Sequence, residues 1–280
     1  MERILTKSKI ESFYTFLKSE EKSENTVEKY VRDVTAFAEY LKDGAITKET
    51  VIAYKSRLME GKYAPRSINS ILASLNSLFS FLGWLDLKMK SIKIQRQIFC
   101  SEEKELSKAE YSRLVRTAKQ KGNERLNLLI QTICGTGIRV SELDFITVEA
   151  VKQGEATVTL KGKTRRVFLV KELKQKLLRY IAEQKITSGA VFITRSGRPI
   201  SRTNIWREMK NLCAEAKVNP EKVFPHNLRH LFARTFYSLE KDIAKLADLL
   251  GHSSIDTTRI YMITNGDEHR RRMENMCLIL

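Results

Sequence analysis

The sequence predicts a mainly α-helical protein with a small β-sheet, folded as two domains. Apolar residues recur every three or four positions through most of the chain, which is the spacing of amphipathic helices. Residues 156–160 and 166–170 are instead rich in β-branched and aromatic residues, and they predict two strands. Between residues 88 and 106 the apolar pattern fades and charge rises. We therefore expect a linker there, between a first domain (1–87) and a second (107–280).

Composition narrows the class of protein further. The chain has 280 residues, of which 42% are hydrophobic, so it can build sizeable cores. Lys and Arg number 50 against 33 Asp and Glu, and the excess lies on both sides of Cys100, which favours nucleic acid as the partner of both domains. No apolar run approaches the roughly 18 residues of a membrane span. The 4 cysteines form no Cys-x-x-Cys pair, so we expect a cytoplasmic protein without a zinc site or disulfides.

The first domain is predicted to contain four helices. Apolar spacing places one helix around residues 10–17, a second over about Asn25–Leu41 and a third from Thr47 to about Glu60. Pro65 begins the fourth, because proline fits the first turn of a helix. Polar residues near that start are candidates for phosphate contacts or, equally, an ordinary solvated surface: Lys62, Arg66, Ser67 and Asn69.

The second domain begins with a capping box, Ser107 to Glu110, which predicts the start of a helix. A strongly apolar helix follows over about 123–134, and Gly135 and Gly137 are expected to break it. After the strand pair, the expected elements are helices over 171–184 and 202–216 with a short strand over 191–194 between them. Four arginines of this region are candidates for contacts to a nucleic-acid backbone: Arg195, Arg198, Arg202 and Arg207.

The last third of the chain carries three short motifs at the ends of predicted helices. They are His226-x-x-Arg229, a Leu-Gly-His that ends at His252, and Tyr261, nine residues later. The glycine of the second motif, Gly251, is expected to end its helix in a left-handed cap. His226 and Arg229 share one helix face, while Leu239 belongs to the apolar side that we expect to be buried. Imidazoles and a guanidinium beside a phenol suit an anionic ligand, and phosphate is the first choice.

The short segment before Tyr261 is predicted from local signals. Ser253 and Asp256 resemble a capping box that starts one more helix. In that helix we expect Ile255, Thr258 and Met262 to point inward and Tyr261 to lie on a different face.

In this order, the three motifs resemble those of the tyrosine recombinases, especially the Xer-like branch. Residues 135–143, Gly-Thr-Gly-Ile-Arg-Val-Ser-Glu-Leu, are similar to the family's first arginine motif. Five residues of the first domain resemble the family's core-binding domain: Ser23, Thr26, Tyr30, Asp33 and Phe37. The resemblance implies a helical, SAM-like core-binding domain followed by a mixed α/β catalytic domain. It also implies site-specific DNA cleavage and rejoining through a 3′-phosphotyrosyl intermediate, with strand exchange between two paired sites.

The resemblance implies six catalytic residues: Arg139, Lys161, His226, Arg229, His252 and Tyr261. The arginines would clamp the non-bridging phosphate oxygens, and the phenol, with an ordinary pKa of about 10, needs cationic neighbours and a base before it can attack. Lys161 in the hairpin would protonate the leaving oxygen, with Lys163 as a rival. Glu142 is expected either to orient a site residue or, equally, to be a surface carboxylate, and His230 to pack beside the site rather than to catalyse.

The implied partners are double-stranded DNA and three further copies of the chain, with no metal or other cofactor. Such a homotetramer would exchange C-terminal tails, although the apolar stripe within residues 267–280 could equally pack on its own core. Chromosome dimer resolution and integration or excision of a mobile element both stay open, as do any host accessory partner and the target site.

Three alternatives use the same residues differently. A type IB topoisomerase-like enzyme or a telomere resolvase would share the chemistry of strand transfer. A metallohydrolase could use His226 and His230 as ligands, but Asn227 stands where His-Glu-x-x-His requires glutamate. A DNA-binding accessory protein without activity is disfavoured because all six matching positions are filled.

Overall fold

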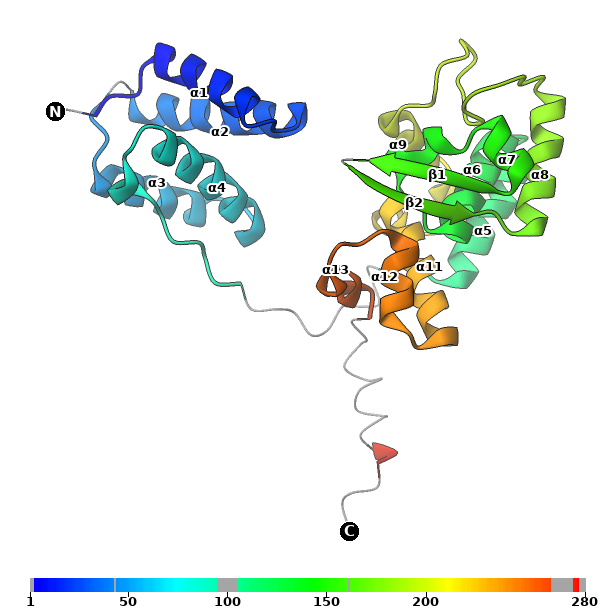
Figure 1. Cartoon of the computed structure of the whole chain (residues 1–280). Coiled ribbons are helices and arrows are strands. Elements are labelled where there is room, and N and C mark those ends of the chain that lie inside the picture. The colour runs from blue at the N-terminus through cyan, green and yellow to red at the C-terminus, as the bar shows by residue number, and fades with distance from the viewer. Residues whose placement is uncertain (1–2, 43, 95–104, 161, 263–273, 277–280) are drawn as a thin grey trace. The chain divides into compact units, whose positions relative to one another are not determined.

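The computed structural model describes residues 3–42, 44–94, 105–160, 162–262 and 274–276 (Figure 1). The chain divides into two compact units, Met1–Arg96 and Gln97–Leu280. The predicted class, mainly helical with a small sheet, is confirmed. The division lies within the predicted linker 88–106, but residues 95–104 are outside the described part, so the domain limits stay a prediction.

The first unit contains the four predicted helices: α1 (Lys7–Ser19), α2 (Glu24–Leu41), α3 (Lys48–Glu60) and α4 (Pro65–Phe81), followed by the 3-10 turn η1 (Leu85–Leu87). Their apolar stripes meet in one core, in which the rings of Phe13, Phe37 and Phe79 are fully buried. Phe37 and Phe79 pack edge to face, with ring centroids 6.1 Å apart.

Two polar residues of this unit have structural partners. Asp33, one of the residues that resemble the core-binding domain, is buried between α2 and α4 and accepts hydrogen bonds from Lys29 and Ser74. Asn69, a candidate for phosphate contact, instead pairs with both backbone groups of Ile92 through its side-chain amide. The side-chain amide of Asn69 is therefore occupied by the backbone of Ile92, which it holds against α4, rather than exposed for a phosphate.

The second unit is built around α6 (Glu124–Thr136), in which every residue from Leu126 to Ile130 is buried. The predicted capping box at Ser107 is present and opens α5. The other elements are α5 (Lys108–Gln120), η3 (Val140–Phe145), α7 (Val148–Gln153), α8 (Lys171–Glu183), α9 (Arg202–Lys210), α10 (Cys213–Ala216) and η4 (Pro220–Lys222). The last ones are α11 (Pro225–Glu240), α12 (Ile243–Leu250), α13 (Ile255–Arg259) and η5 (Ile260–Met262).

The sheet is one antiparallel hairpin of β1 (Glu155–Leu160) and β2 (Lys163–Phe168), green in Figure 1. Leu160 pairs with Lys163, so β2 begins three residues earlier than predicted and only two residues separate the strands. Gly162 has φ +72°, which a residue without Cβ adopts at little cost and which permits so short a turn.

Three other predicted boundaries differ. Gly135 lies inside α6, and the helix ends at Gly137, whose φ is +66°. The expected helix 202–216 is two helices, because a turn after α9 redirects the chain so that Leu212, Cys213 and Ala216 enter the core. In place of the strand over 191–194, the described residues contain two isolated bridges, at Ala190 and Ile193.

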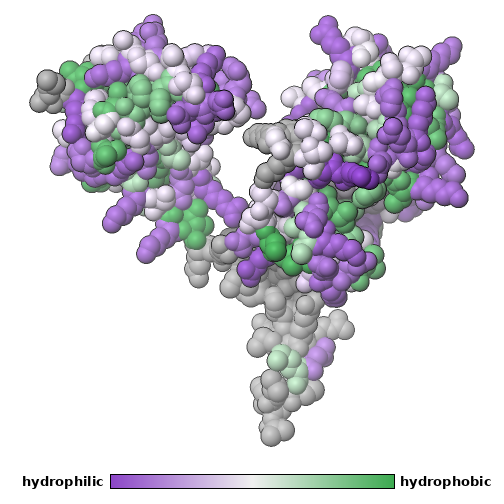
Figure 2. Space-filling view, in the orientation of Figure 1, coloured by the Kyte–Doolittle hydropathy of each residue, from purple (hydrophilic) through white to green (hydrophobic). Residues whose placement is uncertain are grey.

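The visible surface of each unit is mostly hydrophilic, with scattered apolar residues (Figure 2). Leu239, expected inside, is 79% exposed near the end of α11, where the helix runs past the core. Among the described helices, none is long and apolar enough to cross a membrane.

Candidate active site

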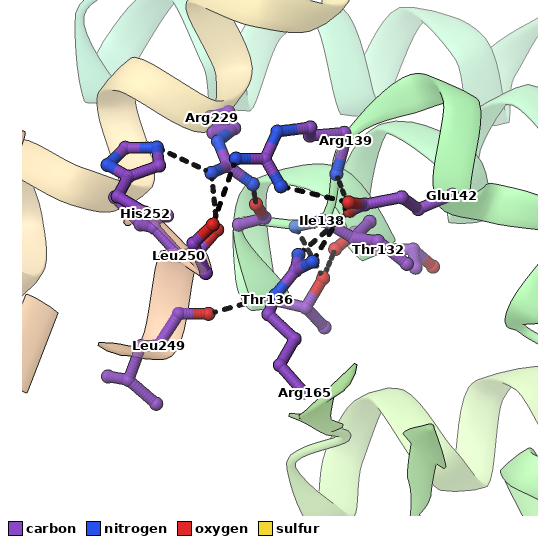
Figure 3. Close-up of polar contacts among 12 residues, drawn as sticks. Thr132, Thr136, Ile138, Arg139, Glu142, Arg165, Arg229, Leu249, Leu250 and His252 are labelled. Atoms are coloured by element: carbon purple, nitrogen blue, oxygen red, sulfur yellow. Dashed lines mark hydrogen bonds and ion pairs between the residues drawn. The ribbon is translucent and has the colours of Figure 1, made fainter. Parts of the chain in front are cut away.

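The site is centred on Arg229 in α11, a charged side chain that is only 2% exposed. Its Nη1 donates to the carbonyl of Gly137, which caps α6, and its Nη2 donates to the carbonyl of Leu250, the last residue of α12, at 2.7 Å (Figure 3). Carbonyls at helix C-termini lack partners in their own helix and carry partial negative charge. Arg229 therefore joins two helix ends that are 92 and 21 residues away from it in sequence.

The guanidinium of Arg229 keeps its positive charge at neutral pH. Burial, with the neighbouring charge of Arg139, lowers its pKa to about 10, and the phenol of Tyr261 acts in the opposite direction. A charged group in this position is compensated by carbonyl dipoles rather than by a carboxylate, so its charge is not cancelled within the site.

Glu142 carries the second set of contacts. Its carboxylate accepts from the Arg139 Nη1 at 2.9 Å and from both terminal nitrogens of Arg165, at 2.9 and 2.8 Å (Figure 3). It also accepts from the backbone N–H of Arg139 at 2.9 Å. Burial alone would raise the pKa of Glu142, but these bonds lower it to about 2. The expectation that Glu142 orients a site residue is met, since it holds Arg139 at both backbone and side chain.

Two glycines of the site, Gly137 and Gly251, allow neighbouring side chains to pack directly against the backbone. A Cβ on Gly137 would lie 2.5 Å from the ring of Phe232, and a Cβ on Gly251 would lie 2.5 Å from the Arg165 Cδ. Gly251 has φ +64° and ends α12 in the predicted left-handed cap, from which His252 emerges.

His252 lies between Arg229 and Thr258. Its Nε2 is 2.9 Å from the Arg229 Nη2, and its Nδ1 is 2.8 Å from the Thr258 Oγ1. Because a guanidinium can only donate, we assign Nε2 as the acceptor and place the proton on Nδ1. Burial and the charges of Arg229, Arg139 and Arg165 lower the pKa of His252 to about 4, so the ring is neutral at neutral pH.

Tyr261 is only 5% exposed and lies among three imidazoles. Its ring centroid is 4.4 Å from that of His230, 5.7 Å from that of His252 and 6.2 Å from that of His226. Burial, with the nearby His226, Arg234 and Arg229, lowers the pKa of His230 to about 3, so His230 is neutral and packs beside the site.

The structure predicted for residues 253–261 is partly wrong. Ser254 rather than Ser253 caps α13, and Ile255 is 48% exposed although Thr258 is buried as expected. Tyr261 turns inward, because its ring completes a small core formed by α11 and α12.

His226 stands at the solvent side of the site, in the first turn of α11. Its surroundings lower its pKa through desolvation and through the charges of Arg229, Arg139 and Arg202. It lines a cavity of about 390 Å³ together with Arg139, Arg229 and the exposed Arg202 and Trp206 of α9. Arg139, whose side chain is 38% exposed, also lines a second cavity, of about 810 Å³, beside the β-hairpin.

The structure brings together five of the six predicted catalytic residues: Arg139, His226, Arg229, His252 and Tyr261. Lys161 lies outside the described residues, and its rival Lys163 opens β2. The sequence interpretation missed Arg165. The two-residue alternation of the strand was the available signal, because Arg165 shares a face with the buried Val167 while Arg166 points to solvent.

Comparisons with known proteins agree with this arrangement. Residues 104–267 match the model of the phage integrase family, and residues 10–85 match that of the phage integrase N-terminal SAM-like domain. The chain is similar to the tyrosine recombinase XerA of Pyrococcus horikoshii, with 29% identity over 99% of this chain and 96% of the relative.

Two solved structures share the fold. A XerH site-specific recombinase bound to its difH substrate, in a pre-cleavage complex, matches with a TM-score of 0.72 and 20% identity, over 98% of this chain and 85% of that one. A lambda integrase tetramer bound to a Holliday junction matches with a TM-score of 0.73 and 18% identity, over 93% and 77%.

The chain therefore belongs to the phage integrase family, the tyrosine recombinases. Its class follows from this membership: it is an enzyme that cleaves and rejoins DNA strands in site-specific recombination. The resemblance inferred from the motifs is confirmed.

Proposed function

We propose that this recombinase cuts double-stranded DNA with Tyr261 as its nucleophile and leaves the 3′ end of the cut strand joined to that tyrosine. The observation that carries this proposal is the position of the phenol, surrounded by three imidazoles and close enough to Arg229 to affect its pKa. The cavity lined by Arg139, His226 and Arg229 offers a phosphate a place on the solvent side of this group.

Arg139 and Arg229 are proposed to hold the non-bridging oxygens of the scissile phosphate. The attack generates a five-coordinate phosphorus with additional negative charge, and guanidiniums already fixed in place stabilise it without reorganisation. The fixed partners of both arginines support this role, because Glu142, the Gly137 carbonyl and the Leu250 carbonyl set their orientation before DNA arrives. Loss of either clamp would cost on the order of 3 kcal/mol of transition-state stabilisation, about a hundredfold in rate.

Protons move in two places. As the phenol oxygen of Tyr261 bonds to phosphorus, His226 accepts the phenolic proton; its lowered pKa keeps it a neutral base. The bond from phosphorus to the 5′ oxygen breaks, and Lys161, or its rival Lys163, supplies the proton that makes a 5′ hydroxyl. The phosphotyrosyl ester conserves the bond energy, so a hydroxyl of the second strand reverses the step without ATP or metal.

His252 changes its role when DNA binds. In the free enzyme its Nε2 accepts from Arg229, so it has no proton to offer a phosphate. An entering phosphate brings negative charge, which favours the protonated ring, and Nε2 can then donate to a phosphate oxygen while Nδ1 stays on Thr258.

The assembly is proposed to be a tetramer on two paired DNA sites, of the Xer type. The lambda integrase tetramer on a Holliday junction and the XerH–difH complex, which share this fold, support both DNA and the tetramer as expectations. Four exposed arginines are proposed to contact the DNA backbone: Arg195, Arg198, Arg202 and Arg207. Dimer resolution and mobile-element integration or excision remain two versions of this proposal.

Exchange of C-terminal tails would hold the tetramer together. Residues 263–273 and 277–280 of the tail lie outside the described part of the chain. An apolar cavity of about 410 Å³ beside α11, lined in part by Phe232, Phe236 and Leu239, offers an apolar helix a docking place and supports this expectation.

The test is a nicked suicide duplex that carries a cognate site. Wild-type protein should form a covalent protein–DNA adduct, and Tyr261→Phe should form none. Tyr237→Phe is the matched control, since Tyr237 packs beside the same small core in α11 and should leave adduct formation intact. Adduct formation at the wild-type rate in Tyr261→Phe would refute the nucleophile, and relaxation of supercoiled DNA without any specific site would indicate the topoisomerase-like alternative.

A further inference from the structure

One carboxylate in this site serves two arginines. Glu142 is 1% exposed, and its oxygens face the Arg139 guanidinium on one side and the Arg165 guanidinium on the other. Arg165 reaches it from β2, 23 residues further along the chain, in a two-nitrogen, two-oxygen geometry that is typical of strong arginine–carboxylate pairs.

Arg165 is held more tightly than Arg139. Its side chain is 12% exposed against 38% for Arg139, and its Nε donates to the Leu249 carbonyl at 3.3 Å. The chain also leaves room for it, because a Cβ at position 251 would meet its Cδ at 2.5 Å. These contacts point Arg165 at Glu142 and leave Arg139 as the more exposed of the pair.

The charges explain why two arginines are needed. Glu142 and Arg139 alone would sum to zero, and both carboxylate oxygens could then hold Arg139 in competition with a DNA phosphate. Arg139, Glu142 and Arg165 together carry one net positive charge. Arg165 also donates to both oxygens of the Glu142 carboxylate. Arg139 keeps a single side-chain bond to Glu142, with a second, 3.4 Å contact from Nη2 to the Gly251 carbonyl.

We infer that Arg165 is a positioning residue for DNA cleavage: it neutralises Glu142, so that Arg139 is oriented by that carboxylate but remains free to bind the scissile phosphate. The inference rests on the proposed role of Arg139. Arg165 need not touch DNA itself, and it couples the β-hairpin to the end of α12 that carries His252.

The experiment measures the rate of adduct formation on the suicide duplex, DNA affinity by mobility shift, and folding by circular dichroism. Arg165→Gln should slow adduct formation roughly tenfold or more, because misplacing a clamp weakens transition-state contacts, with DNA affinity nearly unchanged. Arg166→Gln is the matched control: it removes the same charge from the next residue of β2, whose side chain is 68% exposed, and should stay near the wild-type rate.

The decisive variant is the double substitution Glu142→Gln with Arg165→Gln. If Arg165 acts by neutralising the carboxylate, removal of the carboxylate charge should restore a large part of the lost rate, so the double variant should be faster than Arg165→Gln alone. A purely structural role predicts the opposite, because the double variant loses more contacts. A double variant no faster than Arg165→Gln, or an Arg165→Gln rate equal to that of Arg166→Gln, overturns the inference.

Arg165→Lys is the second variant, measured in case Arg165→Gln does not fold. Lysine retains the charge but reaches only one carboxylate oxygen, so a folded Arg165→Lys should lose less than about tenfold in rate. A loss of a hundredfold with intact folding and DNA affinity would overturn the role of charge. Absence of any Tyr261-dependent adduct in wild-type protein would instead refute the proposed function, which separates the two failures.

Discussion

Substitution of Gly137 by alanine should both destabilise the second unit and shift the guanidinium of Arg229. Gly137 ends α6 with φ +66°, and its carbonyl accepts from Arg229. An added Cβ would lie 2.5 and 2.7 Å from two carbons of the Phe232 ring and 3.0 Å from the Leu250 Cδ2. Leu250 is fully buried and Phe232 packs against the same small core, so the added Cβ must displace the Leu250 side chain or the Phe232 ring.

The magnitude has two parts. A left-handed backbone costs a residue with a Cβ about 1–2 kcal/mol relative to glycine, and overpacking of a tight interior adds about 1–3 kcal/mol. Gly122→Ala isolates the first part, because Gly122 has φ +67° but nothing within 4 Å of the added Cβ. Gly137→Ala should therefore be less stable than Gly122→Ala by about 1–3 kcal/mol, which corresponds to a melting temperature roughly 2–12 °C lower for a unit of this size.

The assay is urea and thermal unfolding of wild type and both variants, followed by adduct formation on the suicide duplex. Gly137→Ala should also cleave more slowly, because its carbonyl is one of the fixed partners of Arg229, while Gly122→Ala should cleave normally. Equal destabilisation by the two substitutions would contradict this prediction, because it would show that the space around Gly137 is not filled by Phe232 and Leu250.

Two more predictions concern the imidazoles. The fold lowers the pKa of His230 to about 3, against an ordinary value of 6.5. Between these two pH values His230 is protonated in the unfolded chain but not in the folded one, so the free energy of unfolding decreases as pH falls from about 6.5 towards 3. His230→Phe lacks this loss, and urea unfolding at several pH values should show its stability gaining on wild type as pH falls; a gap independent of pH would contradict the assignment. Thr258→Val removes the acceptor of His252 Nδ1 with little change in volume, and should slow adduct formation roughly tenfold without weakening DNA binding; an unchanged rate would show that this bond does not orient the ring.

Most of the helices could be predicted from the sequence because their signals are local. Pro65 at a helix start, the Ser107 capping box and the left-handed cap at Gly251 each act within one turn of backbone, and the structure has all three. The predictions failed where tertiary contacts decided how a side chain is placed. Tyr261 turns inward to complete a small core, and the side-chain amide of Asn69 hydrogen-bonds to the backbone of Ile92.

The sequence by itself determined the class of the protein, because the spacing of His226, Arg229, His252 and Tyr261 and the arginine motif at Arg139 are features of the chain alone. Only the tertiary structure decided how their charges are arranged. That Arg229 bonds to helix ends rather than to a carboxylate, and that Arg165 shares Glu142 with Arg139, depends on contacts between residues 21 to 92 positions apart. Periodicity and capping report on neighbours in sequence, whereas the electrostatics of a buried site depend on which groups the fold brings within hydrogen-bonding distance.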